Sequence, residues 1–328
     1  MTIEDMGATG RTEHGARASE RPALIIAGPT ASGKSALALK LAQRFGGTVI
    51  NADAMQCYAE LSIVTARPSA EDERLAPHRL YGVRAATEPA NAAWWRQAAL
   101  REMEASALPI LCGGTGMYFS ALVKGIAAVP EVPEAARAEA RRLLTEQGAP
   151  AVHARLDPET AARLKPADSQ RVSRAYEVLL GTGRGLASWQ AETEPLTGWR
   201  IRMILLDPPR EALRAAIAKR FAAMLEAGAV DEVRALVARN LPLDLPLLRA
   251  HGVPEIAAFL RGEISREEAA ARAILATHQY TKRQMTWFRH QKLTDSTDMQ
   301  IIQSRIEDST QLLERKFGIF DNLIKNKS

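Results

Sequence analysis

Residues 28–35 have the types and the spacing of a loop that binds phosphate groups. They read Gly-Pro-Thr-Ala-Ser-Gly-Lys-Ser, which matches the pattern G-x-x-x-x-G-K-[ST] between an apolar run and a helical pattern. Backbone N–H groups and the dipole of the following helix attract an anion there. Lys34 adds a positive charge, and the Ser35 hydroxyl can hold a divalent cation, expected to be Mg²⁺, that is bound to the phosphates. The predicted diphosphate-binding residues are Gly28, Pro29, Thr30, Ala31, Ser32, Gly33, Lys34 and Ser35.

Asp53 and the run Gly113-Gly114-Thr115 stand where two further predicted strands end. In an open parallel sheet, ligands bind at the carboxyl ends of the strands, beside the first strand–helix loop. A carboxylate at that edge can bind a cation or act as a general base. Glycines at a strand end let a ligand approach the backbone closely, and the Thr115 hydroxyl would face the same edge. Each residue could instead serve only in a turn or as a helix cap.

Four short apolar runs are typical of strands buried in a parallel sheet, and helical patterns follow them. They are Ala23–Ala27, Thr48–Ala52, Pro109–Cys112 and Ile201–Leu206. Between residues 126 and 198 these runs stop, and the chain is rich in Ala, Glu and Arg with helical spacing. The predicted fold class is therefore α/β: a P-loop-type parallel sheet core flanked by helices, with an all-helical insertion domain.

The same pattern divides the chain into an arm, a core, an insertion and a tail. The tail lacks alanine, and its apolar residues from Ile302 to Ile324 follow a roughly helical spacing. This spacing predicts a helix packed on the body, or a partly disordered segment, and indicates no function. The predicted boundaries are 1–21 for a flexible N-terminal arm, 22–125 and 199–292 for the core, 126–198 for the insertion, and 293–328 for the tail.

Composition narrows the class of protein further. The 328 residues carry a formal net charge of +5, and the pI near 9.3 weakly favours a polyanionic partner. No apolar stretch approaches the roughly 20 residues that span a bilayer, and the polar start of the chain resembles no signal or transit peptide. The only cysteines, Cys57 and Cys112, favour two small buried residues over a disulfide scaffold or a metal site. We therefore expect a cytoplasmic protein without a membrane contact. A monomer is also expected, although composition does not determine the oligomeric state.

Basic and aromatic residues alternate most densely near the end of the core. Lys282, Arg283, Arg289 and Lys292 are interleaved with the run from Tyr280 to His290, which includes Trp287 and Phe288. This composition suits phosphate contacts and base stacking on a nucleic acid. A core helix that buries Trp287 and Phe288 is equally consistent with the pattern, and both can hold on opposite faces.

An ordered set of motifs extends over roughly residues 22–292. The set comprises Gly28–Ser35, Asp53-x-Met55-Gln56-x-Tyr58, Thr65-Ala66-Arg67-Pro68, Gly113-Gly114-Thr115, Asp168-x-Gln170-Arg171-Val172-x-Arg174, Gly252-Val253-Pro254-Glu255 and Lys282-Arg283-Gln284-x-Thr286-Trp287. The phosphate loop alone fits many families, whereas the ordered set is specific. Together these motifs resemble the tRNA dimethylallyltransferase (tRNA isopentenyltransferase) family.

The resemblance implies transfer of a dimethylallyl group from dimethylallyl diphosphate to the exocyclic N6 amine of an adenine. That adenine follows the anticodon on its 3′ side, so the implied partner is the anticodon stem-loop of tRNA. By motif, Asp53 matches the general base, Thr115 a channel residue near the amine, and Arg220 an arginine that assists the diphosphate. The implied tRNA-binding residues are Asp53, Ala54, Met55, Gln56, Thr115, Arg137, Gln170, Arg171, Val172, Ser173, Arg174, Arg249, Gly252, Lys282 and Arg283.

The chain departs from the family pattern in one region. The family commonly has an acidic residue, Ile and Gly before the Thr-Ala-basic-Pro element, where this chain has Ser62-Ile63-Val64. A basic residue usually follows the tyrosine matched by Tyr58, where this chain has Ala59 and Glu60. These departures put the geometry of the local loop and one diphosphate or RNA contact in question.

Two other functions fit the phosphate loop. One is a small-molecule kinase that uses ATP, with Asp53 acting as the base toward a hydroxyl group. The other is an RNA-binding protein without catalytic activity, gated by a nucleotide. Transfer of the prenyl group to tRNA, phosphorylation of a metabolite, or RNA binding without turnover distinguishes the three.

Overall fold

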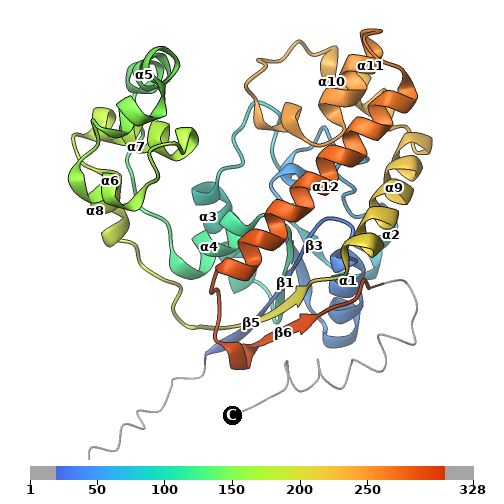
Figure 1. The fold of residues 1–328 in the computed structure, drawn as a ribbon. Coiled ribbons are helices and arrows are strands. Elements are labelled where there is room, and N and C mark those ends of the chain that lie inside the picture. The colour runs from blue at the N-terminus through green and yellow to red at the C-terminus, as the bar shows by residue number, and fades with distance from the viewer. Residues whose placement is uncertain (1–19, 307–328) are drawn as a thin grey trace, which may run out of the picture.

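A parallel sheet of six strands forms the centre of the protein, in the order β3-β2-β4-β1-β5-β6. The computed structural model describes residues 20–306. The four predicted strands and the α/β class are confirmed, and the sheet has two further strands at its edges (Figure 1). The strands are β1 (Arg21–Ala27), β2 (Thr48–Asn51), β3 (His78–Arg79), β4 (Pro109–Gly113), β5 (Trp199–Leu206) and β6 (Met299–Ile302).

Side chains of the central strand alternate between two cores, as the two-residue period of a strand requires. Leu24 and Ile26 point to the face covered by α1 (Lys34–Phe45), whereas Ile25 points to the opposite face. That opposite face is covered by α3 (Ala92–Glu104) and α4 (Gly116–Lys124), which contribute the buried Trp95 and Phe119. The short α2 (Ala70–Leu75) precedes β3.

Four helices form a separate cluster around their own core, visible at the upper left of Figure 1. Helices α5 and α7 make most of this core, with Leu143 and Val152 from α5 and Val172 and Tyr176 from α7. In sequence, the cluster lies between α4 and β5. Its helices are α5 (Glu134–His153), α6 (Pro158–Arg163), α7 (Ser169–Thr182) and α8 (Leu186–Ala191).

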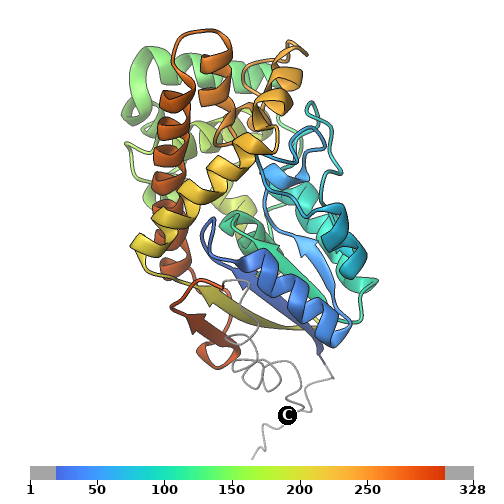
Figure 2. The ribbon, with the colours of Figure 1, turned by 90° about the vertical axis from the view of Figure 1, so that its right-hand side faces the viewer.

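Another helical layer stands above the carboxyl edge of the sheet. Its buried residues, such as Phe221, Val233 and Ile256, pack against Tyr58 and Leu61 from the loop after β2. The long α12 runs beside α9 and descends toward the sheet (Figure 2). The helices are α9 (Arg210–Glu226), α10 (Ala229–Val237), α11 (Val253–Leu260) and α12 (Arg266–His290).

The first part of the tail completes the sheet and reaches the phosphate loop. The prediction of a helix is wrong for Met299–Ile302, which pair with β5 as β6. Ile302 and Ile306 are buried, and the Ile306 N–H donates a hydrogen bond of 3.0 Å to the Ser32 carbonyl. Predictions for 307–328, and for the arm before residue 20, lie outside the described residues. Among residues 20–306 no helix is both long and apolar enough to cross a membrane.

Candidate active site

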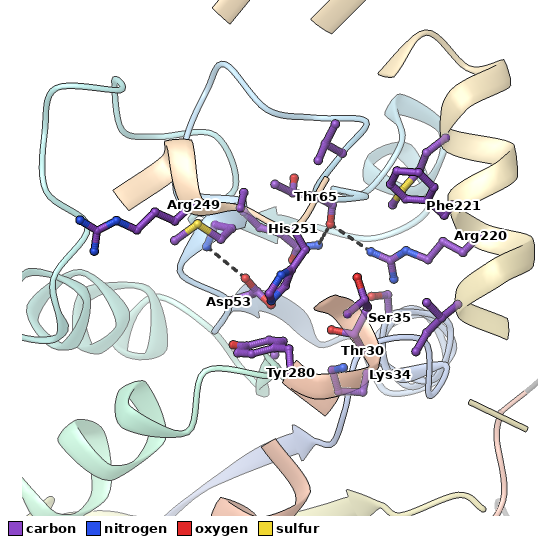
Figure 3. A pocket seen from close by; sticks show the side chains of 18 of the residues that line it. Thr30, Lys34, Ser35, Asp53, Thr65, Arg220, Phe221, Arg249, His251 and Tyr280 are labelled. Carbon is purple, nitrogen blue, oxygen red and sulfur yellow. Dashed lines mark hydrogen bonds between the residues drawn. The ribbon is translucent and has the colours of Figure 1, made fainter. Parts of the chain in front are cut away.

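A cavity of about 640 Å³ opens at the carboxyl edge of the sheet, between the phosphate loop, α9 and α12. Parallel strands that end at one edge bring their loops together, which is why residues distant in sequence meet here. In Figure 3 the side chains of Lys34, Ser35 and Asp53 gather at the centre of this cavity. Arg220 enters from α9 on one side, whereas Arg249 lies on the other side with its guanidinium turned away from Asp53.

The phosphate loop is supported from behind by the tail. Gly33 has φ +90°, and a Cβ atom on it would lie 2.1 Å from the carbonyl oxygen of Ile306, so a side chain would not fit. The Arg305 Nε atom donates to the Ala31 carbonyl over 2.9 Å. Two loop carbonyls, those of Ala31 and Ser32, are therefore bound on the outer side, which leaves the inner side for an anion.

Lys34 lies against its own loop, where its Nζ atom donates 2.7 Å to the carbonyl of Pro29. The pKa of Lys34 is lowered to about 8, chiefly by burial, whereas Cys112 and Asp53 act in the opposite direction and Arg220 makes a smaller lowering contribution. Burial also lowers the pKa of Arg220, and the negative charge of Asp53 partly offsets this effect. Lys34, Arg220 and the Asp53 carboxylate thus share the cavity with two further cations, Arg249 and Arg283, and this excess of positive charge favours a multiply charged anion as the ligand.

Asp53 is positioned by a buried asparagine that the sequence analysis did not identify. Asn51 accepts a hydrogen bond from the Asp53 N–H (2.8 Å) and donates to the carbonyls of Asp53 and Leu80 (both 3.0 Å). Trp95 Nε1 donates to the Asn51 carbonyl over 2.6 Å. The Asp53 side chain accepts only at Oδ1, from the Met55 N–H (3.0 Å), among the hydrogen bonds of residues 20–306. The other oxygen, Oδ2, is therefore available to a substrate proton or a cation.

The region that departs from the family pattern is held by a carboxylate of α10. Glu232 accepts four hydrogen bonds of 2.6–2.9 Å, from the N–H groups of Ser62, Ile63 and Val64 and from the Ser62 hydroxyl. The loop then continues to Thr65, whose carbonyl accepts from Gln56 (2.9 Å) and Arg220 (3.2 Å). The loop is ordered without the usual glycine, and it orients Arg220 toward the cavity.

Gln284 of α12 connects the phosphate loop with the loop after β4. It is 4% exposed, its Oε1 accepts from the Thr30 N–H, and its Nε2 donates to the Gly114 carbonyl, both over 3.0 Å. The neighbouring Thr115 accepts a hydrogen bond from the Ala54 N–H (3.0 Å). These bonds fix the relative positions of α12, the phosphate loop and the loop that carries Thr115.

Gln284→Leu is expected to lower the free energy of unfolding by about 2–4 kcal/mol, because it leaves a buried donor and a buried acceptor unsatisfied. We also expect weaker binding of inorganic diphosphate at the phosphate loop, since the Thr30 N–H loses its anchor. Thermal melting and calorimetry measure the two effects. Gln279→Leu is the control, because Gln279 is exposed on the same helix. An equal effect of both substitutions would mean that Gln284 has no positioning role.

The structure brings many of the predicted residues to the cavity wall. Ala54 and Thr115 are not among the lining residues, but the Ala54 N–H, next to Asp53, donates a hydrogen bond to the Thr115 hydroxyl and braces the loop. Gln170 is the one lining residue that comes from the separate helical cluster. The predicted residues that line the cavity are Thr30, Lys34, Ser35, Asp53, Met55, Gln56, Gln170, Arg220, Arg249 and Arg283.

Other predicted residues are not at the cavity. Val172 and Ser173 are buried in the helical cluster, so their side chains are not presented to a partner. Lys282 is on the opposite side of α12, where it lines a second cavity. Gly252 caps α11 with φ +99° and packs near Phe221. The remaining cations of the cluster, Arg137, Arg171 and Arg174, are exposed and each lies near an acidic residue one turn away.

Several further lining residues had no role predicted from the sequence, and three of them carry polar or aromatic groups suited to a ligand: Thr65, His251 and Tyr280. The rings of His251 and Tyr280 are 4.8 Å apart, and the Arg283 guanidinium lies 5.7 Å from the Tyr280 ring. Burial lowers the pKa of His251, which favours the neutral form of its ring. An aromatic pair beside a cation is a suitable surface for a nucleobase. The basic–aromatic alternation around Tyr280 was the available signal for it.

The fold and the cavity define an α/β protein of the P-loop class, with a carboxylate beside an anion-binding loop. A family model for IPP transferase matches residues 56–291, and one for isopentenyl transferase matches residues 22–86. A tRNA dimethylallyltransferase from Acidiphilium cryptum is 63% identical over 90% of this chain and 92% of that protein. A tRNA dimethylallyltransferase from Granulibacter bethesdensis is 55% identical over 93% of this chain and 98% of that protein. The chain belongs to the tRNA dimethylallyltransferase family.

Solved structures agree with this assignment. The crystal structure of a full-length tRNA isopentenylpyrophosphate transferase from Bacillus halodurans has a TM-score of 0.62 at 28% identity, over 93% of this chain and 98% of that one. A eukaryotic dimethylallyltransferase described as acting on tRNA has a TM-score of 0.77 at 23% identity, and the match covers 94% of this chain and 80% of that one. The second likeness concerns the fold alone.

Proposed function

We propose that this protein transfers the dimethylallyl group of dimethylallyl diphosphate to the N6 amine of the adenine that follows the anticodon of tRNA. The observation that carries the proposal is the shared cavity of Asp53 and the phosphate loop. The names of its relatives support a prenyl transfer to tRNA rather than a phosphoryl transfer. The kinase hypothesis is therefore not favoured.

In the proposed reaction, the adenine amine attacks C1 of the allyl group. The C1–O bond to the diphosphate breaks, an N6–C1 bond forms, and one N6 proton passes to the Asp53 carboxylate. An adenine amine is a weak nucleophile because its lone pair is delocalised, so a base within hydrogen-bond reach accelerates the attack. The target adenine must leave its stack to enter the cavity, where His251 and Tyr280 offer ring faces.

Negative charge grows on the leaving diphosphate as its bond to carbon breaks. Lys34 and Arg220 line the cavity, and their charges would stabilise the leaving group. We propose that Mg²⁺ is held by the Ser35 hydroxyl together with the diphosphate oxygens, because Mg²⁺ commonly uses few protein ligands beside substrate phosphates. Ser35 and Asp53 both face the cavity, so the oxygen donors suit this ion (Figure 3). The bound ion would neutralise charge on the diphosphate.

A direct assay tests the proposal. Purified protein is incubated with Mg²⁺, labelled dimethylallyl diphosphate and unmodified tRNA, and the digested tRNA is analysed for prenylated adenosine. Label in that nucleoside is the expected result. A protein that binds tRNA but never incorporates the label would support RNA binding without catalysis. Phosphate transfer from ATP to a metabolite, with unlabelled tRNA, would instead support the kinase hypothesis.

Arg171→Gln is expected to raise the KM for tRNA several-fold with little change in kcat. Arg171 is exposed, its Nε atom lies 3.6 Å from Asp168, and it follows Gln170, which lines the cavity. Losing one phosphate contact also reduces the slope of log affinity against log salt by about 1. Arg163→Gln is the control, because Arg163 is an exposed arginine of the same cluster paired with Glu159. Unchanged tRNA affinity in Arg171→Gln would assign Arg171 to the local structure.

We also propose that the enzyme acts in the cytoplasm as a monomer. Cys57 and Cys112 are buried free thiols, which suits a reducing compartment. The phosphate loop, Asp53 and Arg220 all come from one chain, so the proposed chemistry requires no second copy.

A further inference from the structure

A second cavity, of about 410 Å³, lies on the other side of α12. We call it the α9–α12 groove. It is bordered by the end of β5, the first turns of α9 and the C-terminal half of α12. Six of its lining residues are ionisable: Asp207, Arg210, Arg214, His278, Lys282 and Arg289.

The charges of the α9–α12 groove do not balance. Asp207, its only acidic lining residue, accepts hydrogen bonds of 2.8 and 2.9 Å from the Arg289 guanidinium. Arg210, Arg214 and Lys282 form no ion pair with any residue between 20 and 306. Three unpaired cations therefore remain around the cavity, which attracts a negatively charged ligand.

Two further features add hydrogen-bond donors to the groove. Helix α9 has 17 residues, and Pro209 at its N-cap makes no side-chain capping bond, so the first N–H groups lack a side-chain acceptor. These groups and the helix dipole favour an anion. On the opposite wall, the Nε2 atom of His278 is buried and has no hydrogen-bond partner among residues 20–306.

We propose that the α9–α12 groove binds a phosphate group at a site separate from the reaction cavity. The guanidinium groups of Arg210 and Arg214 supply a fork geometry for phosphate oxygens, and Lys282 adds a third charge. Helix α12 lines both cavities: Tyr280 and Arg283 face one, and Thr281 and Lys282 face the other. A phosphate of the bound RNA backbone or a free phosphorylated molecule offers the required chemistry. The RNA source rests on the function proposed above.

The test compares Arg210→Gln/Arg214→Gln with a matched control, Arg74→Gln/Arg266→Gln. The control arginines are exposed and line neither cavity, and their substitution removes the same amount of positive charge. The first measurement is the affinity for unmodified tRNA over a range of salt concentrations. The second is the shift in melting temperature caused by inorganic phosphate, with Lys34→Met included in both proteins to weaken the phosphate loop.

The expected result is a loss of most of the phosphate-dependent shift in the groove variant and not in the control. If the slope of log tRNA affinity against log salt also falls by about 1–2, the RNA backbone is the source. An unchanged slope identifies a free phosphorylated molecule. The proposal is overturned if groove and control variants agree in both measurements. Failure of prenyl transfer by the wild-type protein would overturn only the proposed function, because the phosphate-dependent shift is measured without that reaction.

Discussion

Asp53→Asn is expected to lower kcat for prenyl transfer by about 10²–10⁴-fold, the usual contribution of a positioned general base. Asparagine keeps the shape of the side chain, and its amide oxygen can still accept from the Met55 N–H. The variant should therefore fold normally and bind dimethylallyl diphosphate with little change. Single-turnover transfer to unmodified tRNA measures the rate, and calorimetry measures the binding.

Two further variants separate the chemistry of Asp53 from its position. Asp244→Asn removes the same charge at an exposed residue outside both cavities and should leave kcat unchanged. Asn51→Leu keeps the carboxylate but removes its supports, so we expect a lower kcat together with a lower melting temperature. Normal turnover in Asp53→Asn would exclude Asp53 as the base.

The central sheet and the phosphate loop could be predicted because they depend on local sequence. Four strands are buried on both faces and therefore read as short apolar runs. The phosphate loop has a fixed spacing, and the strand before it brings Lys34 and Ser35 to the same edge of the sheet at which Asp53 follows β2. One rule about parallel sheets was enough to expect these side chains in a single cavity.

The edge strands could not be predicted, because nothing in their own residues requires them. Strand β3 has two residues, and β6 lies in a segment whose apolar spacing suggested a helix. Ile302 is buried only because β6 pairs with β5 and its side chain meets the core around α1. The contact of Ile306 with the phosphate loop depends on the same distant pairing.

The residues that position the site could not be predicted from the sequence for a similar reason. Asn51 and Gln284 act through hydrogen bonds to backbone groups, and a backbone partner leaves no signal in the residue type. Glu232 satisfies four donors of the loop after Tyr58, which explains how that loop is held without the family's usual residues. Lys282 shows the converse, since a motif gave its position in sequence but not the side of α12 it occupies.

Lys34→Met is expected to weaken the binding of dimethylallyl diphosphate by about 10- to 100-fold, as for the loss of one charge-assisted hydrogen bond. Lys34 Nζ donates to the Pro29 carbonyl, so this side chain must turn away from Pro29 to reach a diphosphate. Lys34 is the only charged residue within the loop 28–35, so its ammonium group is the nearest positive charge along the chain to the loop amides. Lys40→Met, on the same helix and outside the cavity, should bind the diphosphate normally.

The lowered pKa of Lys34, about 8, gives this binding a pH dependence of known sign. Only protonated Lys34 attracts the diphosphate, and the bound anion raises the pKa of Lys34 in turn. Affinity is therefore constant below pH 8 and falls as the pH rises through 8, by up to about tenfold per pH unit, until the pKa of the bound state is reached. Calorimetric titrations from about pH 7 to 9.5 measure this fall. Arginine stays protonated throughout this range, so the affinity of Lys34→Arg for the diphosphate should not depend on pH. A fall in affinity of equal size in Lys34→Arg would mean that another group titrates.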